Sequence, residues 1–244
     1  MLYTLALEKI ASPDWEGRLS IYKNITTDFM LLCEFVSFIV GLIFFKKYKG
    51  TPVVLFIIFL GYNMLNEHVA SLYYILGNDN NHIFYNIRSG IYFPLMLTFY
   101  WLFLKTNKFK KATLILGCVW LIIYLSALLL GNFEYSFDLL TSSLGDFILM
   151  LIILFNLIEI INSSNLSNVT DNIVVYVSLG FLIYFVADLP ISVIIYTGWL
   201  RDATEEEVKF FILFRQISMV IGSFMYLIFA YGLWKSKRPD VKLK

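Results

Sequence analysis

The segment "PVVLFIIFLGYNMLNEHVASLYY", residues 52–74, joins an unbroken apolar run to a group of polar side chains. An α-helix needs roughly 20 mostly apolar residues to cross the hydrocarbon core of a bilayer, and this segment is long enough. Polar side chains are costly at that depth, so where they occur they face protein, water or a ligand. The segment carries Asn63, Asn66, Glu67 and His68. It therefore predicts a membrane-spanning helix with a polar face turned into the protein.

The whole chain has the composition of an integral membrane protein. Of its 244 residues, 59% are hydrophobic and only 15% are charged, and the mean hydropathy is +0.74. Soluble domains carry roughly 25% charged residues. The net charge of +1 offers no electrostatic basis for binding nucleic acid. We therefore expect the lipid bilayer, and no nucleic acid, as a partner of the chain.

Seven segments of the chain are long and apolar enough to cross a membrane. The predicted spans are residues 27–45, 52–77, 83–104, 112–131, 137–161, 173–199 and 207–234. The predicted fold class is an all-α integral membrane protein, a seven-transmembrane helix bundle. We assign residues 1–26 to an extracytoplasmic segment with an interfacial helix, residues 27–234 to the transmembrane domain, and residues 235–244 to a basic cytoplasmic tail.

The connections between the spans differ in charge. "KKYKG" (46–50), "KTNKFKK" (105–111) and "KSKRPDVKLK" (235–244) hold nearly all of the Lys and Arg outside the spans. The alternate connections are polar or acidic, as in "RDATEEE" (201–207). Since cytoplasmic loops of membrane proteins carry an excess of Lys and Arg, the N-terminus is predicted outside and the C-terminus in the cytoplasm.

Most charged residues inside the spans fall in the predicted outer half of the membrane. They are Glu34, Glu67, Arg88, Asp146, Asp188 and Arg215. Helical spacing of three or four residues places further polar groups on the same faces, namely Asn63, Tyr92 and Tyr184. Such polar stripes face protein or water, so we expect them to converge on a polar pocket that opens outward. A network of ion pairs that only locks helix packing is the alternative.

The charges of this predicted pocket do not balance. Four carboxylates meet two guanidinium groups, which stay protonated, so two carboxylates are in excess. These two are protonated, solvated or matched by a cationic ligand. The predicted ligand-binding residues are Glu34, Asn63, Glu67, Arg88, Tyr92, Asp146, Tyr184, Asp188 and Arg215.

Several kinds of chemistry find no support in the sequence. The chain has two His residues, too few for a His-built zinc site, and no glycine-rich phosphate loop. We therefore expect no metal and no cofactor.

An enzyme and a transporter remain as alternatives. In "SSLGDFILML" (142–151) and "GFLIYFVADLP" (180–190), Asp146 and Asp188 each follow a small residue in an apolar helix. The two motifs are similar to the aspartate motifs of lysoplasmalogenase-type membrane hydrolases, which have eight spans and a wider separation between the motifs. Two buried acids with different protonation states could perform general acid–base chemistry on a lipid. A small transporter or channel component is the third class.

Parts of the chain also resemble a group of small multi-span membrane proteins of Bacteroidota. The resemblance covers about residues 50–237 and rests on "NNHIFYNIRSGIYFPLM" (80–96), "KTNKFKK" (105–111), "VSLGFLIYFVADLP" (177–190) and "YGLWKSK" (231–237). Asp188 departs from the small or polar residue that is usual there. Because such proteins often occur beside sensor kinases, the resemblance implies a sensory or accessory role in a bacterial inner membrane.

Together these observations predict a receptor-like or sensory membrane module. Its polar pocket would take a small-molecule or lipid ligand. The inner connections are too short to hold a catalytic domain, so the signal would pass to a separate partner protein at the cytoplasmic face.

Overall fold

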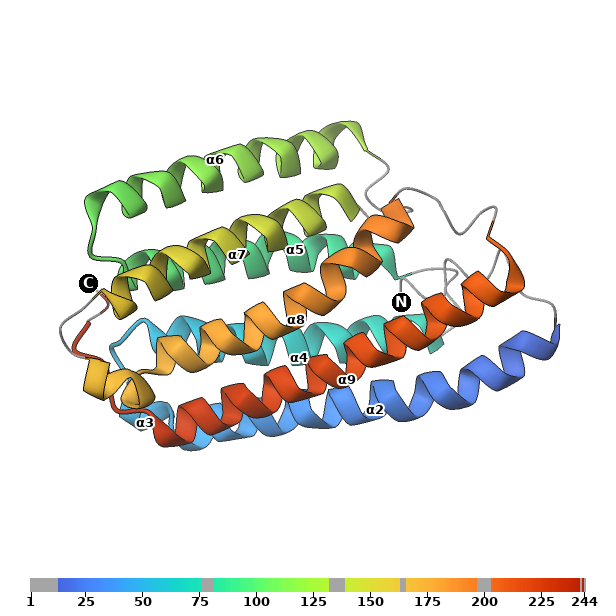
Figure 1. The fold of residues 1–244 in the computed structure, drawn as a ribbon, viewed down its shortest axis with the longest axis horizontal. Coiled ribbons are helices and arrows are strands. Elements are labelled where there is room, and N and C mark those ends of the chain that lie inside the picture. The colour runs from blue at the N-terminus through green and yellow to red at the C-terminus, as the bar shows by residue number, and fades with distance from the viewer. Residues whose placement is uncertain are drawn as a thin grey trace.

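A computed structural model describes the chain over residues 13–75, 81–131, 139–162, 166–196, 203–241 and 243. Over these ranges it contains helices and no strand (Figure 1). The long helices are α2 (Pro13–Ile43), α4 (Val53–Ile75), α5 (His82–Phe103), α6 (Asn107–Leu130), α7 (Leu139–Ile161), α8 (Ile173–Tyr196) and α9 (Glu205–Lys235). Two short elements, α3 (Phe45–Tyr48) and the 3-10 helix η1 (Leu166–Asp171), lie in connections. The all-helical class expected from composition is confirmed.

Each predicted span contains one long helix, and most ends agree within a few residues. The larger differences are at the start of α2 and at the start of α6, which begins at Asn107, ahead of the predicted residue 112. Pro13 begins α2, which runs without a break through residues 13–26, while residues 1–12 of the predicted interfacial segment lie outside the described ranges. Helix α9 begins at Glu205 because Thr204 caps it: the Thr204 hydroxyl accepts the Glu207 N–H at 3.4 Å, and Glu207 Oε2 accepts the Thr204 N–H at 2.7 Å.

The long helices run side by side along one direction (Figure 1). Neighbouring helices follow the order α2, α4, α5, α7, α8, α9 and back to α2, which closes a ring. Helix α6 lies outside this ring and packs against α5 and α7. The ring encloses the space in which side chains from distant parts of the sequence meet.

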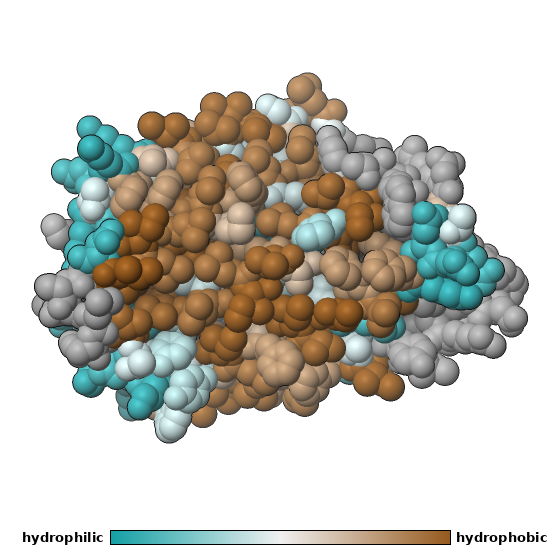
Figure 2. Space-filling model, in the orientation of Figure 1, coloured by the Kyte–Doolittle hydropathy of each residue, from teal (hydrophilic) through white to brown (hydrophobic). Residues whose placement is uncertain are grey.

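Six of the described helices are long and apolar enough to cross a membrane: α2, α4, α6, α7, α8 and α9. Large apolar side chains cover the visible middle of the molecule, while hydrophilic residues gather at its two ends (Figure 2). These features indicate a multi-pass membrane protein. Helix α5 has 22 residues but is not among the six, because Asn86 and Arg88 interrupt its apolar sequence.

Aromatic side chains fill the ring near the end where α4 and α8 begin. Phe56 of α4 contacts Phe229 of α9 edge to face, with ring centroids 5.0 Å apart. Phe181 of α8 lies 5.0 Å from Phe229 and 5.8 Å from Phe59 of α4. Phe56 and Phe229 are fully buried. This aromatic layer is a packed core and separates the polar residues described below from that end of the bundle.

The basic connections meet at the same end. Tyr48 donates to the Leu233 carbonyl at 2.8 Å, and Lys47 Nζ donates to the carbonyls of Leu233 and Trp234, both at 3.1 Å. These donors satisfy carbonyls in the last turn of α9, which have no partner within the helix. The partial burial that this position requires lowers the pKa of Lys47.

The tail beyond α9 folds back over this end. Lys237 N–H donates to the Asp171 carbonyl at 2.9 Å, and Lys237 Nζ lies 2.6 Å from Asp171 Oδ2. Arg238 donates to the Lys49 carbonyl at 2.9 Å. The connections after α2 and α7 and the tail therefore form one basic end.

Candidate functional site

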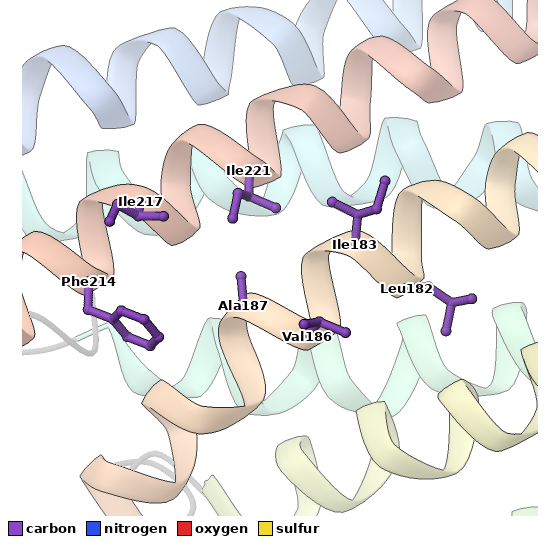
Figure 3. Close-up of a pocket in the computed structure, with 7 residues that line it drawn as sticks. All are labelled: Leu182, Ile183, Val186, Ala187, Phe214, Ile217 and Ile221. Atoms are coloured by element: carbon purple, nitrogen blue, oxygen red, sulfur yellow. The ribbon is translucent and has the colours of Figure 1, made fainter.

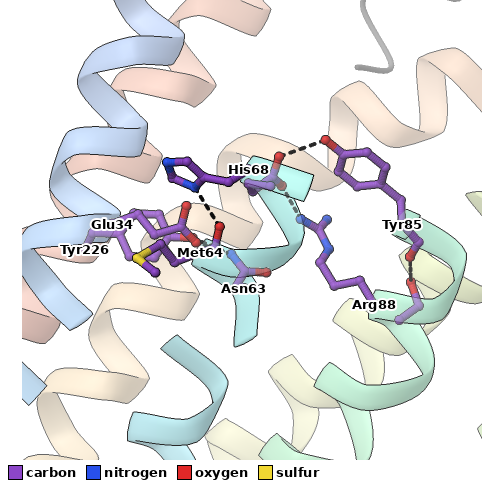
Figure 4. A network of polar contacts seen from close by, with 9 residues as sticks. Glu34, Asn63, Met64, His68, Tyr85, Arg88 and Tyr226 are labelled. Atoms are coloured by element: carbon purple, nitrogen blue, oxygen red, sulfur yellow. Dashed lines mark hydrogen bonds and ion pairs between the residues drawn. The ribbon is translucent and has the colours of Figure 1, made fainter. Parts of the chain in front are cut away.

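The predicted site residues converge inside the ring, on the side of the aromatic layer away from the basic end. We call the group the polar centre; its members are Glu34, Asn63, Glu67, Tyr85, Arg88, Tyr92, Asp146, Tyr184, Asp188, Arg215, Ser218 and Tyr226. They come from α2, α4, α5, α7, α8 and α9, so every helix of the ring contributes. Part of the polar centre is drawn in Figure 4.

The first ion pair of the polar centre joins α4 to α5. Arg88 Nη1 lies 2.6 Å from Glu67 Oε1, and the side chains are 28% and 15% exposed. Tyr85 donates to the other oxygen, Glu67 Oε2, at 2.7 Å. Both α5 side chains point toward α4 (Figure 4), and the Arg88 guanidinium also lies over the Tyr85 ring at 4.9 Å. Both Glu67 oxygens therefore have donors, and one of them is cationic.

The second ion pair joins α8 to α9. Arg215 Nη1 lies 2.6 Å from Asp188 Oδ1, with side chains 14% and 12% exposed. Ser218, one turn after Arg215, donates to the same oxygen at 3.1 Å. Like the first ion pair, this one joins two long helices that are consecutive in the chain.

Glu34 has neutral partners only. Asn63 Nδ2 donates to Glu34 Oε1, and Tyr226 OH donates to the same oxygen at 3.0 Å. Asn63 Nδ2 also donates to Tyr226 OH at 2.8 Å, which closes a triangle between α2, α4 and α9. Glu34 is fully buried, with no exposed area.

Asp146 also has a neutral partner. Tyr92 of α5 donates to Asp146 Oδ1 of α7 at 3.1 Å. Unlike Glu34, Asp146 is only partly buried. Its neighbour Gly145 lets α6 approach closely: a Cβ there would lie 2.9 Å from Trp120 Nε1, which donates to the Thr141 carbonyl at 3.0 Å.

The separate contacts belong to one electrostatic group. Arg88 interacts electrostatically with Glu67, Tyr184 and Tyr226, and also with Asp146. Asp146 and Asp188 act on one another in the same way. The convergence expected from helical spacing is thus present. Arg88 acts on both unpaired acids of the polar centre, Glu34 and Asp146.

The charge excess expected from the sequence has a definite location. The two arginines are used by Glu67 and Asp188, at 2.6 Å each. Glu34 and Asp146 have no ion pair among the residues that the structure describes. Burying a carboxylate without a cation is costly, so each of these two acids needs a proton, another positive group or water.

Three members of the polar centre are absent from the predicted ligand-binding residues: Tyr85 of α5, and Ser218 and Tyr226 of α9. Tyr226 lies eleven residues after Arg215, which is close to three helical turns, and Ser218 lies three residues after it. Both therefore share a face of α9 with Arg215, and this spacing was the available signal.

Two polar residues of the opening segment lie off the polar centre. His68 is exposed, and its ring Nδ1 lies 2.8 Å from the Met64 carbonyl of its own helix (Figure 4). Asn66 is buried, and its Nδ2 has no hydrogen-bond partner among the described residues. Neither contacts the acids or arginines through a hydrogen bond that the structure records.

An apolar groove lies between α8 and α9, with a volume of about 530 Å³ (Figure 3). Its lining residues are Leu182, Ile183, Val186, Ala187, Phe214, Ile217 and Ile221. Ala187 and Phe214 immediately precede the ion-paired Asp188 and Arg215. The groove therefore lies next to the second ion pair, and three of its lining residues, Ile183, Val186 and Ile217, are exposed on the surface.

No group of three or more His, Cys, Asp or Glu side chains that could hold a metal ion occurs within the described ranges. Comparison of the chain with protein-family models, with curated proteins and with solved structures found no match.

Proposed function

We propose that the chain is a seven-helix protein of a bacterial inner membrane, with the N-terminus outside and the C-terminus in the cytoplasm. Helix α5 is the seventh span: its 22 residues extend about 33 Å, and its Arg88 is neutralised by Glu67. The orientation is supported by the basic end, where Lys47, Lys237 and Arg238 lie together, as expected for a cytoplasmic face.

We propose further that the protein is a receptor-like sensory module that binds a small cationic ligand in the polar centre. The observation that carries this proposal is that the two ion pairs leave two acids, Glu34 and Asp146, without a cation. Asp146 is the one of the two that is partly exposed, so it is the anchor for the positive group. Tyr92 and Tyr184 form the walls beside it.

A ligand at Asp146 has a route to the rest of the bundle through Arg88. Arg88 interacts with both Glu67 and Asp146. A cation at Asp146 neutralises that acid and repels the guanidinium, so Arg88 pairs more strongly with Glu67. Since the Glu67–Arg88 pair joins α4 to α5, ligand binding would change the packing of these helices. A partner protein at the basic end would respond to that change.

The aromatic layer favours a sensor over a transporter. Phe56 and Phe229 are fully buried and contact each other between the polar centre and the basic end. Such a core offers no polar path for a solute or ion. The resemblance to membrane proteins found beside sensor kinases supports the same choice.

The test is a ligand screen on the purified protein in lipid nanodiscs. Thermal unfolding is followed with a panel of small primary, secondary and quaternary amines and alkali cations. We expect at least one amine to raise the Tm of the wild type, and Asp146→Asn to abolish the rise. Glu206→Gln, which removes an exposed acid at the start of α9, is the matched control, and the amine should still raise its Tm. An amine whose effect is unchanged in Asp146→Asn, or a panel without effect, contradicts the proposal.

A lipid hydrolase is the second candidate, and the apolar groove is the observation that favours it. The groove could admit an acyl chain beside Asp188, and Asp146 interacts electrostatically with that residue. Asp188 is ion-paired and Asp146 is not, which is a suitable asymmetry for general acid–base chemistry. Release of free fatty acid, aldehyde or lysolipid from nanodisc lipids, lost in both Asp146→Asn and Asp188→Asn, would replace the sensor proposal with this one.

A further inference from the structure

The hydrogen bonds of Glu34 are distributed unevenly over its two oxygens. Oε1 accepts from both Asn63 and Tyr226. Oε2 is buried and has no hydrogen-bond partner within the described part of the chain. The residue has no exposed area, so solvent at the surface does not supply a donor.

An unpartnered hydroxyl lies one helical turn away on the same face of α2. Ser37 is fully buried, and its Oγ likewise has no partner among the described residues. Side chains on a helix point toward its N-terminus, so the Ser37 hydroxyl is directed back toward the turn that holds Glu34. Two buried oxygens in one turn thus each need a hydrogen-bond partner.

This pattern fits a neutral carboxylic acid better than a carboxylate. An ionised carboxylate only accepts hydrogen bonds and needs donors at both oxygens when it is buried. A protonated one has a carbonyl oxygen that accepts and a hydroxyl that donates. In Glu34, Oε1 is the acceptor of two bonds, and Oε2 is in the place of the hydroxyl.

The charged groups around Glu34 offer no cation to replace the proton. The titratable and charged groups that act on it are Glu67 on α4, Arg88 on α5 and Tyr226 on α9. Arg88 is already paired with Glu67 at 2.6 Å. Glu67 is itself an acid and opposes a second negative charge at Glu34.

We propose that Glu34 is a proton-binding site, which carries a proton on Oε2 at neutral pH. Its O–H group donates a hydrogen bond to Ser37 Oγ, after a small side-chain rotation or through one bridging water. Release of the proton leaves a buried charge at the junction of α2, α4 and α9. Proton binding therefore stabilises the packing of α2 against the other two helices. The inference rests on the proposed function for the placement of Glu34 in the membrane interior, but its test needs no ligand.

The direct test is infrared spectroscopy of the full chain in nanodiscs at neutral pH. The carbonyl-stretch band of protonated carboxyl groups should be present in the wild type and should lose intensity in Glu34→Gln. Ser37→Ala removes the acceptor of the O–H group, so the remaining band should shift to higher frequency. Ser178→Ala is the matched control, because Ser178 is equally buried on α8 but donates to Tyr100; it should leave the band in place.

Asp146→Asn distinguishes the contributions of the two unpaired acids to the infrared band. If Asp146 is also protonated, this variant loses the part of the band that comes from Asp146 and keeps the part that comes from Glu34. Like a protonated Glu, a Gln side chain has one oxygen that accepts hydrogen bonds and one group that donates them. Glu34→Gln should therefore fold with a Tm close to that of the wild type at neutral pH. At alkaline pH the wild type should lose Tm as Glu34 ionises, and Glu34→Gln should lack that step. An infrared band unchanged by Glu34→Gln would overturn the inference, whether or not an amine ligand is found.

Discussion

Arg88 and Arg215 each form an ion pair inside the bundle, but the two ion pairs are buried to different degrees. Each has a guanidinium nitrogen 2.6 Å from a carboxylate oxygen. The Arg215–Asp188 pair is the more buried, with side chains 14% and 12% exposed against 28% and 15% for Arg88 and Glu67. Removing one member of a buried pair leaves the other charge uncompensated, and this cost rises with burial.

We expect Arg215→Ala to lower the free energy of unfolding by about 3–5 kcal/mol, and Arg88→Ala by about 1–3 kcal/mol because its site is wetter. Denaturant titration in mixed micelles measures both. The double variant Arg215→Ala/Asp188→Ala should recover part of the loss, since no unpaired acid remains. Equal losses for the two single variants would show that burial does not set the strength of these pairs.

At the scale of the helices, glycines let α6 approach its neighbours closely, and Gly145 of α7 is one of them. It lies outside the ring and contacts only α5 and α7 closely. Trp120 of α6 is buried, stacks on Phe93 with centroids 4.2 Å apart, and donates to the Thr141 carbonyl. Gly145 leaves the room that the indole occupies.

Gly145→Ala should therefore lower stability by about 1–3 kcal/mol, since the added Cβ would lie 2.9 Å from Trp120 Nε1 and 3.3 Å from Phe93. Gly222→Ala is the control: its nearest atom is Met30 Sδ at 3.2 Å, the end of a flexible side chain. Tm values of the two variants and the wild type give the comparison. A smaller loss for Gly145→Ala than for Gly222→Ala would argue against close packing of α6.

The tail after α9 is held by a contact that depends on pH. The Lys237 ammonium beside Asp171 holds the pKa of that carboxyl below its usual range near 4. The ion pair is therefore fully present at neutral pH and is lost as the pH falls through this lowered pKa.

We expect hydrogen-exchange protection of the Lys237 amide, which donates to the Asp171 carbonyl at 2.9 Å, to decrease on acidification. In Asp171→Asn the protection should already be low at neutral pH. Asp240→Asn, which removes an exposed acid of the same tail, should behave like the wild type. Protection that does not depend on Asp171 would assign tail docking to the backbone hydrogen bonds alone.

For the whole molecule, the arrangement of charge at the two ends decides how it inserts. The basic end gathers Lys47, Lys237 and Arg238, whereas the start of α9 at the other end is acidic. By the positive-inside rule, this difference supports the proposed orientation, with the first end in the cytoplasm.

Cysteine labelling of intact cells checks this orientation. In a Cys118→Ser background, a membrane-impermeant thiol reagent should label Glu206→Cys and should not label Lys108→Cys. Cys118 is replaced because it is exposed, while Cys33 is buried. Lysed cells provide the control, in which both positions should react. Labelling of Lys108→Cys alone in intact cells would reverse the assignment.

Much of the fold is predictable from the sequence because the mean hydropathy of a segment depends only on the residues of that segment. The stretch at 173–199 predicts α8 at Ile173–Tyr196 without knowledge of any other helix. Helical spacing also predicts which side chains share a face, such as Asn63 and Glu67. It does not predict the partner of either, since that depends on how the neighbouring helix is rotated.

By itself the sequence determined a helical, membrane-type chain, the positions of its helices, and an excess of two acids over arginines in the predicted pocket. Only the tertiary structure decided that Glu67 pairs with Arg88 and Asp188 with Arg215, and hence that Glu34 and Asp146 are the acids in excess. It also decided that Tyr226 joins Glu34 and that α6 stays outside the ring. The physical reason is that charge and hydropathy are properties of single residues and short segments, whereas the pairing of charges is set by the packing of whole helices.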